Sequence, residues 1–415
     1  MTSPNALGSR PAAEAYLERV CFKIGPPALV GAELEWFTHL PDGSRPSLDL
    51  LATALGDHAP VSLNPASAAL PLRSGNVVSV EPGGQLELSS APAASADLVV
   101  DAMARDTEGL RALLAPHDIA LGAGGADTER TPERLLTLPR YCAMESRFDT
   151  VGPFGRAMMC NTAAVQISVD AGRDRAEIRD RWETLHAVGP ALLAAFAATP
   201  ALAGVPAEPW ASQRMRTWFE LDRTRTRVPL GVDPVVDYAR WALDVPLLCI
   251  RMGDRLQAPP RETTFAQWLA GALDDVAGRG EHRPTTADLD YHLTTLFPLV
   301  RAGGHLEVRY LDGQPEGLWD VPVHAVAALV GAAGVRAVAR DAVRGTESRW
   351  EDSARLGLAD AALADAASAV LTVAAAASAG GVADRLRAAA DRCAAQLAPG
   401  ESRPAARAHT KETAR

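Results

Sequence analysis

The stretch VEPGGQLELS, residues 80–89, places two carboxylates beside a tight turn and gives them no basic neighbour. Pro82 fixes its own φ and the glycine pair after it can adopt positive φ, so the backbone can reverse between Glu81 and a short strand. Side chains alternate along a strand, so Glu87 points away from the leucines that flank it. Unpaired carboxylates of this kind suit a hard cation such as Mg²⁺. A solvated surface turn is the alternative interpretation.

The segment LVGAELEWF, residues 29–37, predicts a second strand with acids on one face. Period-two alternation puts Glu33 and Glu35 on one side and apolar residues on the other. Acidic residues are depleted in strands, so two on one face need an explanation. Taken alone, the segment fits a solvated face as well as a ligand site.

The bulk composition limits the class of protein. The 415 residues are 47% hydrophobic and carry a net charge of -10, which predicts a soluble globular protein and argues against a broad nucleic-acid or anionic-membrane surface. The five cysteines are widely spaced without a Cys-x-x-Cys pair, which favours a reducing cytoplasm over a disulfide or zinc framework. No signal peptide or membrane span is predicted, so we expect a cytoplasmic protein.

The predicted domain organisation is simple. We expect disordered tails at residues 1–10 and 399–415 and a single domain at 11–398, whose part from about residue 323 onward is Ala-rich and helical.

A third strand signal has one hydrogen-bonding face. Alternation from Thr162 onward sets Thr162 and Gln166 opposite an apolar face, and Asn161 stands directly before them. Neutral polar groups on such a face suit a small polar ligand. The neighbouring Met158 and Met159 are typical core filler.

The densest basic cluster is RMRTWFELDRTRT, residues 214–226, with four arginines. Guanidinium groups bind carboxylates and phosphates in a bidentate manner, so capture of such a group is one interpretation. A solvated loop with internal Asp–Arg pairs is the other.

A later strand at residues 303–310 puts Glu307 and Arg309 on one face. They fit a surface ion pair, or a metal ligand next to a phosphate clamp. If the strands meet, five carboxylates come together and their repulsion must be relieved by protonation or by cations. Divalent metal ions bound together with ATP would relieve the repulsion with the fewest assumptions. Such a site can transfer a phosphoryl group to a carboxylate, which an amine then attacks.

Six motifs then occur in unbroken order: GxExE at 31–35, EPGGQxELS at 81–89, MMxxTxxxQ at 158–166, WxxxDxxRT at 218–226, HLTTLFPxVR at 292–301 and LExR at 306–309. Together they resemble the successive motifs of the glutamate–cysteine ligases of the plant and bacterial type. The resemblance extends from about residue 30 to residue 309. It is nearest to the compact branch that makes γ-glutamylcysteine for ergothioneine.

This resemblance implies an α+β, glutamine-synthetase-like fold, in which a curved, mainly antiparallel sheet forms a funnel surrounded by helices, and it makes 11–398 a single catalytic domain. It implies a Mg²⁺- and ATP-dependent ligase that joins L-glutamate to L-cysteine through γ-glutamyl phosphate, for ergothioneine or another low-molecular-weight thiol. A related ligase with a different amine acceptor and a non-catalytic glutamate- or nucleotide-binding regulator are the alternatives. We expect no nucleic-acid or membrane partner and leave the oligomeric state open, a monomer included.

The resemblance also assigns acids and arginines. Arg309 matches the phosphate-facing arginine that contacts ATP, and with Glu87 it is an expected catalytic residue. Arg225, with Trp218 nearby, matches the part that holds the α-carboxylate of glutamate, and Arg214 is a further candidate. The family's metal-binding acids correspond to Glu33, Glu35, Glu81, Glu87 and Glu307.

Thr162 and Gln166 fall on the family's substrate strand, with Asn161 beside them. Where the plant sequences have Thr after Met159, this chain has Cys160, so the resemblance leaves the cysteine pocket unassigned.

Overall fold

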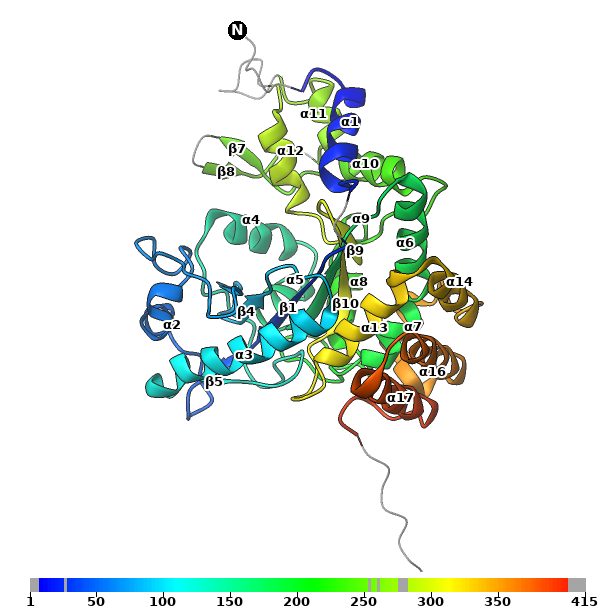
Figure 1. Cartoon of the computed structure of the whole chain (residues 1–415). Helices are drawn as coiled ribbons and strands as arrows, with labels where there is room; N and C mark the ends of the chain where they lie inside the picture. The colour runs from blue at the N-terminus through cyan, green and yellow to red at the C-terminus, as the bar shows by residue number, and fades with distance from the viewer. Residues whose placement is uncertain (1–6, 26–27, 253–254, 260–261, 275–282, 402–415) are drawn as a thin grey trace, which may run out of the picture.

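The computed structural model describes residues 7–25, 28–252, 255–259, 262–274 and 283–401 (Figure 1). The tails predicted at 1–10 and 399–415 lie largely outside the described residues. The end of the first predicted tail that the structure describes is ordered: Leu7 is buried, and Ser9 caps the first helix, which begins at Arg10.

A six-stranded sheet organises the molecule. Each strand pairs with its neighbours in the antiparallel sense, as the sequence led us to expect. The order across the sheet is β3 (Val77–Val80), β4 (Leu86–Ser89), β1 (Val30–Trp36), β6 (Ala164–Val169), β10 (Leu306–Asp312) and β9 (Val300–Ala302).

The two faces of this sheet have different chemistry. The apolar alternation predicted for β1 is observed, since Ala32 and Leu34 are buried while Glu33 and Glu35 lie on the opposite side. Helices α3 (Ala96–Leu114) and α13 (Asp320–Gly331) contact β1 and β6 and cross the sheet in Figure 1. They cover the apolar face, so burial of aliphatic side chains there stabilises strands whose other face is charged.

Strand β10 contains an irregularity next to β6. Val308 pairs with Ile167, but the next pair is Leu311 with Val165, so two residues of β10 face Gln166. A β-bulge of this kind bends the strand and redirects a side chain. It displaces the backbone at Arg309, which is the arginine predicted to face phosphate.

The remaining elements surround the sheet. Two small sheets pair β2 (Thr38–His39) with β5 (Ala120–Leu121) and β7 (Ile250–Met252) with β8 (Arg255–Gln257). The helices are α1 (Arg10–Cys21), α2 (Leu48–Leu55), η1 (Gly56–His58), η2 (Ala115–His117), α4 (Pro139–Phe148), α5 (Phe154–Cys160), α6 (Arg175–Ala187), α7 (Gly189–Phe196), α8 (Gln213–Leu221), α9 (Arg223–Thr226), α10 (Pro234–Asp244), α11 (Phe265–Leu269), α12 (Thr286–Leu293), α14 (Ala333–Ala342), α15 (Trp350–Leu356), η3 (Gly357–Ala359), α16 (Ala361–Ala376) and α17 (Gly380–Ala394).

The arginine cluster corrects one interpretation. Residues 214–226 form α8 and α9 instead of a solvated loop, and Arg214, Arg216 and Arg225 are buried. Ser212 caps α8 by accepting a hydrogen bond from Met215 N, which explains why the helix begins there.

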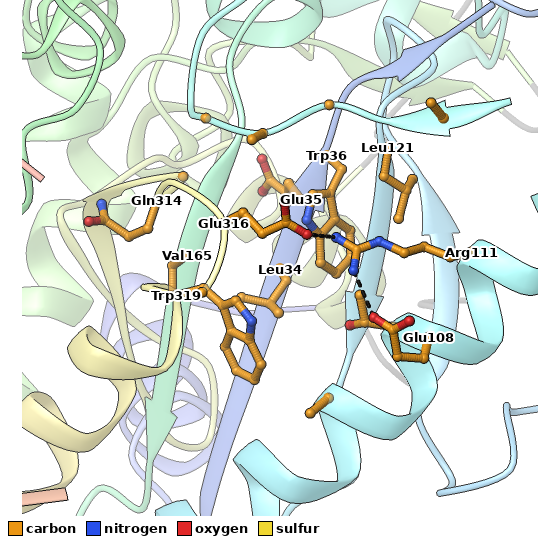
Figure 2. A pocket seen from close by; sticks show the side chains of 18 of the residues that line it. Leu34, Glu35, Trp36, Glu108, Arg111, Leu121, Val165, Gln314, Glu316 and Trp319 are labelled. Carbon is orange, nitrogen blue, oxygen red and sulfur yellow. Dashed lines mark hydrogen bonds and ion pairs between the residues drawn. The ribbon is translucent and has the colours of Figure 1, made fainter. Parts of the chain in front are cut away.

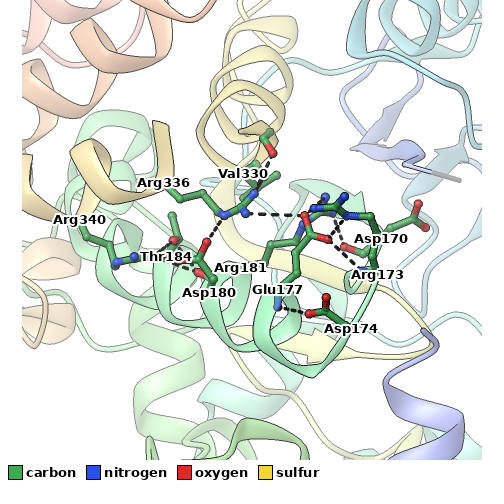
Figure 3. Close-up of polar contacts among 11 residues, drawn as sticks. Asp170, Arg173, Asp174, Glu177, Asp180, Arg181, Thr184, Val330, Arg336 and Arg340 are labelled. Atoms are coloured by element: carbon green, nitrogen blue, oxygen red, sulfur yellow. Dashed lines mark hydrogen bonds and ion pairs between the residues drawn. The ribbon is translucent and has the colours of Figure 1, made fainter. Parts of the chain in front are cut away.

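An ionic cluster joins α6 to α14 (Figure 3). Asp180 accepts from Arg336 Nε at 2.5 Å and from Arg340 Nη1 at 2.5 Å. Arg336 also donates to Val330 O at 2.7 Å, which ties the end of α13 into the same network. These contacts hold α14 and the end of α13 against α6.

Within the described ranges, no single helix has the length and apolar composition of a membrane span. Two bent pairs, α13 with α14 and α15–η3 with α16, pass that test only when joined across bends of 112° and 91°.

The turn that carries Glu81 gives a stability prediction. A Cβ on Gly83 would lie 2.6 Å from the backbone Cα of Cys160, so Gly83→Ala must displace the turn. We expect it to lower the free energy of unfolding by about 1–3 kcal/mol, measured by urea denaturation. Gly109→Ala, in the middle of α3 with nothing within 4 Å of the added atom, is the control and should be neutral or stabilising. Equal effects of the two substitutions would contradict this account.

Candidate active site

A polar cavity of about 240 Å³ opens on the charged face of the sheet, and we call it the acid cavity. The sheet supplies its floor, while α4, α5 and α8 supply its walls. The residues that line it include Glu33, Glu35, Glu81, Glu87, Thr162, Gln166, Arg140, Arg214, Arg301, Arg309, Tyr141, Trp218 and Phe297. Four of the five predicted acids therefore come together, although they are far apart in sequence.

Strand pairing brings the carboxylates close to one another. Glu35 pairs directly with Glu87 across β1 and β4, and Glu33 lies two residues before Glu35 on the same face. Like charges directly opposite destabilise a sheet. Ser79 and Ser89 donate to Glu87 Oε1 at 2.6 and 3.2 Å, which satisfies that oxygen without cancelling its charge.

The cost of this crowding appears in the pKa values of the acids. Burial, followed by the charge of Glu87, raises the pKa of Glu33 to about 8 and that of Glu35 to about 7. The same two causes raise the pKa of Glu81 well above its ordinary value. Clustered acids with raised pKa values are typical of functional sites, and a bound cation would favour their ionised forms.

Gln166 connects the acids to the arginines. Its Nε2 donates to Glu33 Oε2 at 3.1 Å and to Glu35 Oε1 at 3.0 Å, and its Oε1 accepts from Arg309 Nε at 3.0 Å. Ala164 N donates to the other oxygen of Glu35 at 2.9 Å. Neutral donors thus orient both acidic side chains without supplying a compensating positive charge.

The opposite side of the cavity is cationic and aromatic. Arg309 and Arg214 lie over the Trp218 ring, with 4.9 and 5.4 Å between each guanidinium carbon and the ring centroid. Arg214 Nη2 donates to Arg309 O at 2.7 Å, and that carbonyl lies at the bulge of β10. Burial, helped by the charge of Arg301, lowers the pKa of Arg309 to about 10.

Glu307, the fifth predicted acid, lies beside the cavity lining and is held by arginines. It is 1% exposed, its Oε2 accepts from Arg301 Nε at 2.6 Å, and its Oε1 lies 3.4 Å from Arg309 Nε. The surface ion-pair interpretation of Glu307 and Arg309 is therefore wrong, because both side chains are largely removed from solvent.

Two predicted substrate residues lie outside the lining of the acid cavity. Arg225 is fully buried and donates to Asp222 at 2.9 Å and to Pro246 O at 2.5 Å. Asn161 is also fully buried; it donates to a backbone carbonyl at 2.5 Å and accepts from Arg45 at 2.8 Å. Their contacts hold chain segments together, so the geometry gives no support to direct substrate contact by either residue.

The other predictions for this region do reach the cavity. Thr162, Gln166, Trp218 and Arg214 line it, and Thr162 Oγ1 donates to Met158 O at 2.7 Å. Sequence reasoning missed Arg140, Tyr141, Phe297 and Arg301 as lining residues. Arg301 ends the HLTTLFPxVR motif and directly follows Val300, so strand alternation places the two side chains on opposite faces. That pattern could have identified Arg301 as a residue of the polar face.

The donor set of the acid cavity suits a hard divalent cation, because oxygen ligands dominate it. Its carboxylates are distributed around the cavity: among the described residues, no three His, Cys, Asp or Glu side chains converge as a formed metal centre. Glu33, Glu35, Glu81 and Glu87 are the residues that would hold Mg²⁺, through rotation of side chains that no ion pair with arginine restrains in the described part of the chain. Glu307, beside the lining, would join them only after Arg301 left its Oε2 oxygen.

A larger cavity of about 560 Å³ lies between α3 and the connection from β10 to α13 (Figure 2). Arg111 is held there between Glu108 at 2.7 Å and Glu316 at 3.0 Å. Two carboxylates already neutralise that guanidinium, so this cavity offers a polyanion less than Arg309 and Arg214 do.

Several known proteins are similar to this chain in sequence. The model of glutamate-cysteine ligase family 2 (GCS2) matches residues 29–408. Glutamate–cysteine ligase EgtA of Mycobacterium tuberculosis is 37% identical over 373 residues, which cover 88% of this chain and 82% of that protein. EgtA of Mycolicibacterium smegmatis is 37% identical over 368 residues, with 86% and 81% covered. The chloroplastic glutamate–cysteine ligase of Brassica juncea is 32% identical over 248 residues, with 57% and 46% covered.

A solved structure shares the fold. Glutamate–cysteine ligase from Francisella tularensis, in complex with AMP, superposes with a TM-score of 0.56 at 13% identity, over 90% of this chain and 83% of that one. At this identity the likeness concerns the fold alone. It confirms the expected α+β class, in which helices surround a mainly antiparallel sheet.

The raised pKa values predict how stability depends on pH. The folded protein keeps protons on Glu33 and Glu35 that the unfolded chain loses above its pKa of 4.5, so unfolding releases protons between about pH 4.5 and pH 8. Stability of the metal-free protein from this source is therefore full below pH 4.5 and falls as the pH rises through that window. Thermal unfolding with a chelator should show the fall, and the Glu33→Gln/Glu35→Gln variant should show a smaller one. An identical pH slope in both proteins would refute the assignment.

Proposed function

Because the chain belongs to glutamate-cysteine ligase family 2, we propose that it is an ATP-dependent ligase that forms γ-L-glutamyl-L-cysteine. The observation that carries this proposal is the acid cavity, where four carboxylates without arginine partners in the described structure face Arg309, Arg214 and Trp218. Such a cavity is prepared for a polyanion that brings its own cations, which is the form in which ATP binds.

The first step that we propose is transfer of the γ-phosphoryl group. An oxygen of the glutamate γ-carboxylate attacks the γ-phosphorus of ATP, the bond to the bridging oxygen breaks, and ADP leaves with that electron pair. Arg309 lies where it can stabilise negative charge on the transferred group, since its Nη1 is buried without a hydrogen-bond partner among the described residues. Mg²⁺, held by the cavity acids, would supply neutralisation of phosphate charge.

The second step consumes γ-glutamyl phosphate. The amine of cysteine attacks the acyl carbon, phosphate leaves, and the nitrogen loses a proton as the amide forms. The walls of the cavity keep water from the acyl phosphate, since Trp218 and Phe297 are buried beside it.

Arg214 replaces Arg225 in our proposal for the α-carboxylate of glutamate. It lines the cavity next to Trp218, whereas Arg225 has its donors occupied inside the protein. A planar guanidinium in that position can pair with a carboxylate in a bidentate manner.

The product would feed ergothioneine or another low-molecular-weight thiol, which the similarity to two EgtA proteins supports. We place the enzyme in the cytoplasm, where ATP and reduced cysteine are available; the five cysteines are free thiols. A different amine acceptor remains the second candidate, because Cys160, next to the lining residue Met159, stands where the plant sequences have threonine.

Phosphate release tests the activity. With ATP, Mg²⁺ and glutamate, the protein should release phosphate when cysteine is added and form the γ-linked dipeptide, identified by mass spectrometry. Glu87→Gln should lower kcat at least about a hundredfold, because it removes a charge from the cavity. The control Glu108→Gln, an exposed residue of α3, should retain activity. Equal use of other amino acids would exclude cysteine as the acceptor, and a fully active Glu87→Gln would favour a binding protein over a ligase.

A pair of conservative variants separates the two arginines. Arg214→Lys should raise KM for glutamate about tenfold or more and change KM for ATP little, because lysine cannot pair in a bidentate manner. Arg225→Lys should lower Tm without a selective change in KM, since that arginine bonds to chain groups. Steady-state kinetics and thermal unfolding measure both. A selective rise in KM for glutamate in folded Arg225→Lys would return the role to Arg225.

A further inference from the structure

Glu307 differs from the four acids that line the cavity, because arginine already holds it. Arg301 of β9 pairs with Glu307 of β10 in register, and both Arg301 Nε and Nη2 contact Glu307 Oε2, at 2.6 and 2.5 Å. Glu307 Oε1 has no hydrogen-bond partner among the described residues. Arg301 thus occupies one oxygen of this carboxylate, and the other lies 3.4 Å from Arg309 Nε without a hydrogen bond.

The two partners have unequal burial. Glu307 is 1% exposed, while the side chain of Arg301 is 36% exposed and lines the acid cavity. A carboxylate so deeply buried needs a positive partner. Arg309 supplies only part of that charge, since its Nε donates to Gln166. Burial lowers the pKa of Arg301, but Glu307 and Glu33 outweigh that effect and raise it above its ordinary value. Arginine is charged in proteins in any case, so Arg301 supplies a permanent positive charge.

We propose that Arg301 is the built-in counter-cation of the acid cavity. It neutralises Glu307 in the ligand-free protein, and binding of a divalent cation together with nucleotide displaces it from that carboxylate. The inference rests on the proposed function, because it takes the acid cavity as the metal–nucleotide site. Arg301 acts through Glu307 and is therefore a positioning residue. Its guanidinium, once released, can pair with phosphate oxygens in the same cavity.

This arrangement has a consequence for the affinity of free metal. A guanidinium on a ligand carboxylate repels a divalent ion and competes with it for the same oxygen. Metal alone should therefore bind weakly, whereas a metal–nucleotide complex brings phosphates that can take over Arg301. A partner that only oriented Glu307 would have the opposite effect, because loss of such a partner typically weakens metal binding about 10- to 100-fold.

The Mn²⁺ affinity of Arg301→Gln distinguishes these roles. In electron paramagnetic resonance titrations without nucleotide, we expect Mn²⁺ to bind about tenfold more tightly than to wild type. Thermal unfolding should show a lower Tm in chelator and a larger gain in Tm on adding Mn²⁺. If the metal-free variant is unfolded, the Mn²⁺ concentration that restores folding gives the same comparison. Unchanged or weaker Mn²⁺ binding would overturn the proposal.

Two controls isolate the charge. Arg301→Lys keeps the positive charge and should bind Mn²⁺ within about threefold of wild type. Arg349→Gln removes a similar double contact, to Asp360 at 3.0 and 2.8 Å, away from the acid cavity, and should lower Tm without changing Mn²⁺ affinity. Wild type that binds no Mn²⁺ even with ADP would overturn the proposed function and the role of Arg301 with it. Normal wild-type binding without tightening in Arg301→Gln would overturn the role of Arg301 alone.

Discussion

The structure depends on holding four acidic side chains close together on one face of a sheet, with no arginine ion pair to any of them among the described residues. Glu35 opposes Glu87 across two strands, and Glu33 lies on the same face. Burial and mutual repulsion both penalise ionisation there. The compensation comes from the other face, where leucine, valine and isoleucine side chains pack beneath α3 and α13. A strand that is charged on one side can persist because its apolar side is covered without interruption.

Neutral groups do the positioning inside the acid cavity. Gln166 reaches two carboxylates with one amide and accepts from Arg309 with its oxygen. An arginine at this position would satisfy the acids and leave no charge for a cation. The β10 bulge completes the arrangement, because it gives Arg309 a backbone carbonyl that Arg214 can use and brings both guanidiniums over Trp218.

Local pattern in the sequence predicted what each strand contributes, and it could not predict what lies beside it. Alternation placed Glu33 and Glu35 on one face, and the turn chemistry around Gly83 placed Glu81 next to a short strand. The bulge left no mark in the alternation of β10. Our proposal of Arg214 in place of Arg225 required knowing that α8 faces the cavity and that Pro246, which lies outside the local motif, approaches Arg225. Tertiary contacts of this kind are absent from any local window.

The distribution of arginines then gives the cavity two unlike ends. Glu81 and Glu87 lie toward the β3–β4 hairpin, whereas Glu307 is enclosed by Arg301 and Arg309 on the far strands of the sheet. Phosphoryl transfer spreads charge over several oxygens at once, so cations are needed on more than one side of the transferred group. A single sheet face meets that need if metal is held at the acidic end and guanidinium at the other. The order of the strands, with β1 and β10 on either side of β6, therefore sets which oxygens each end can reach.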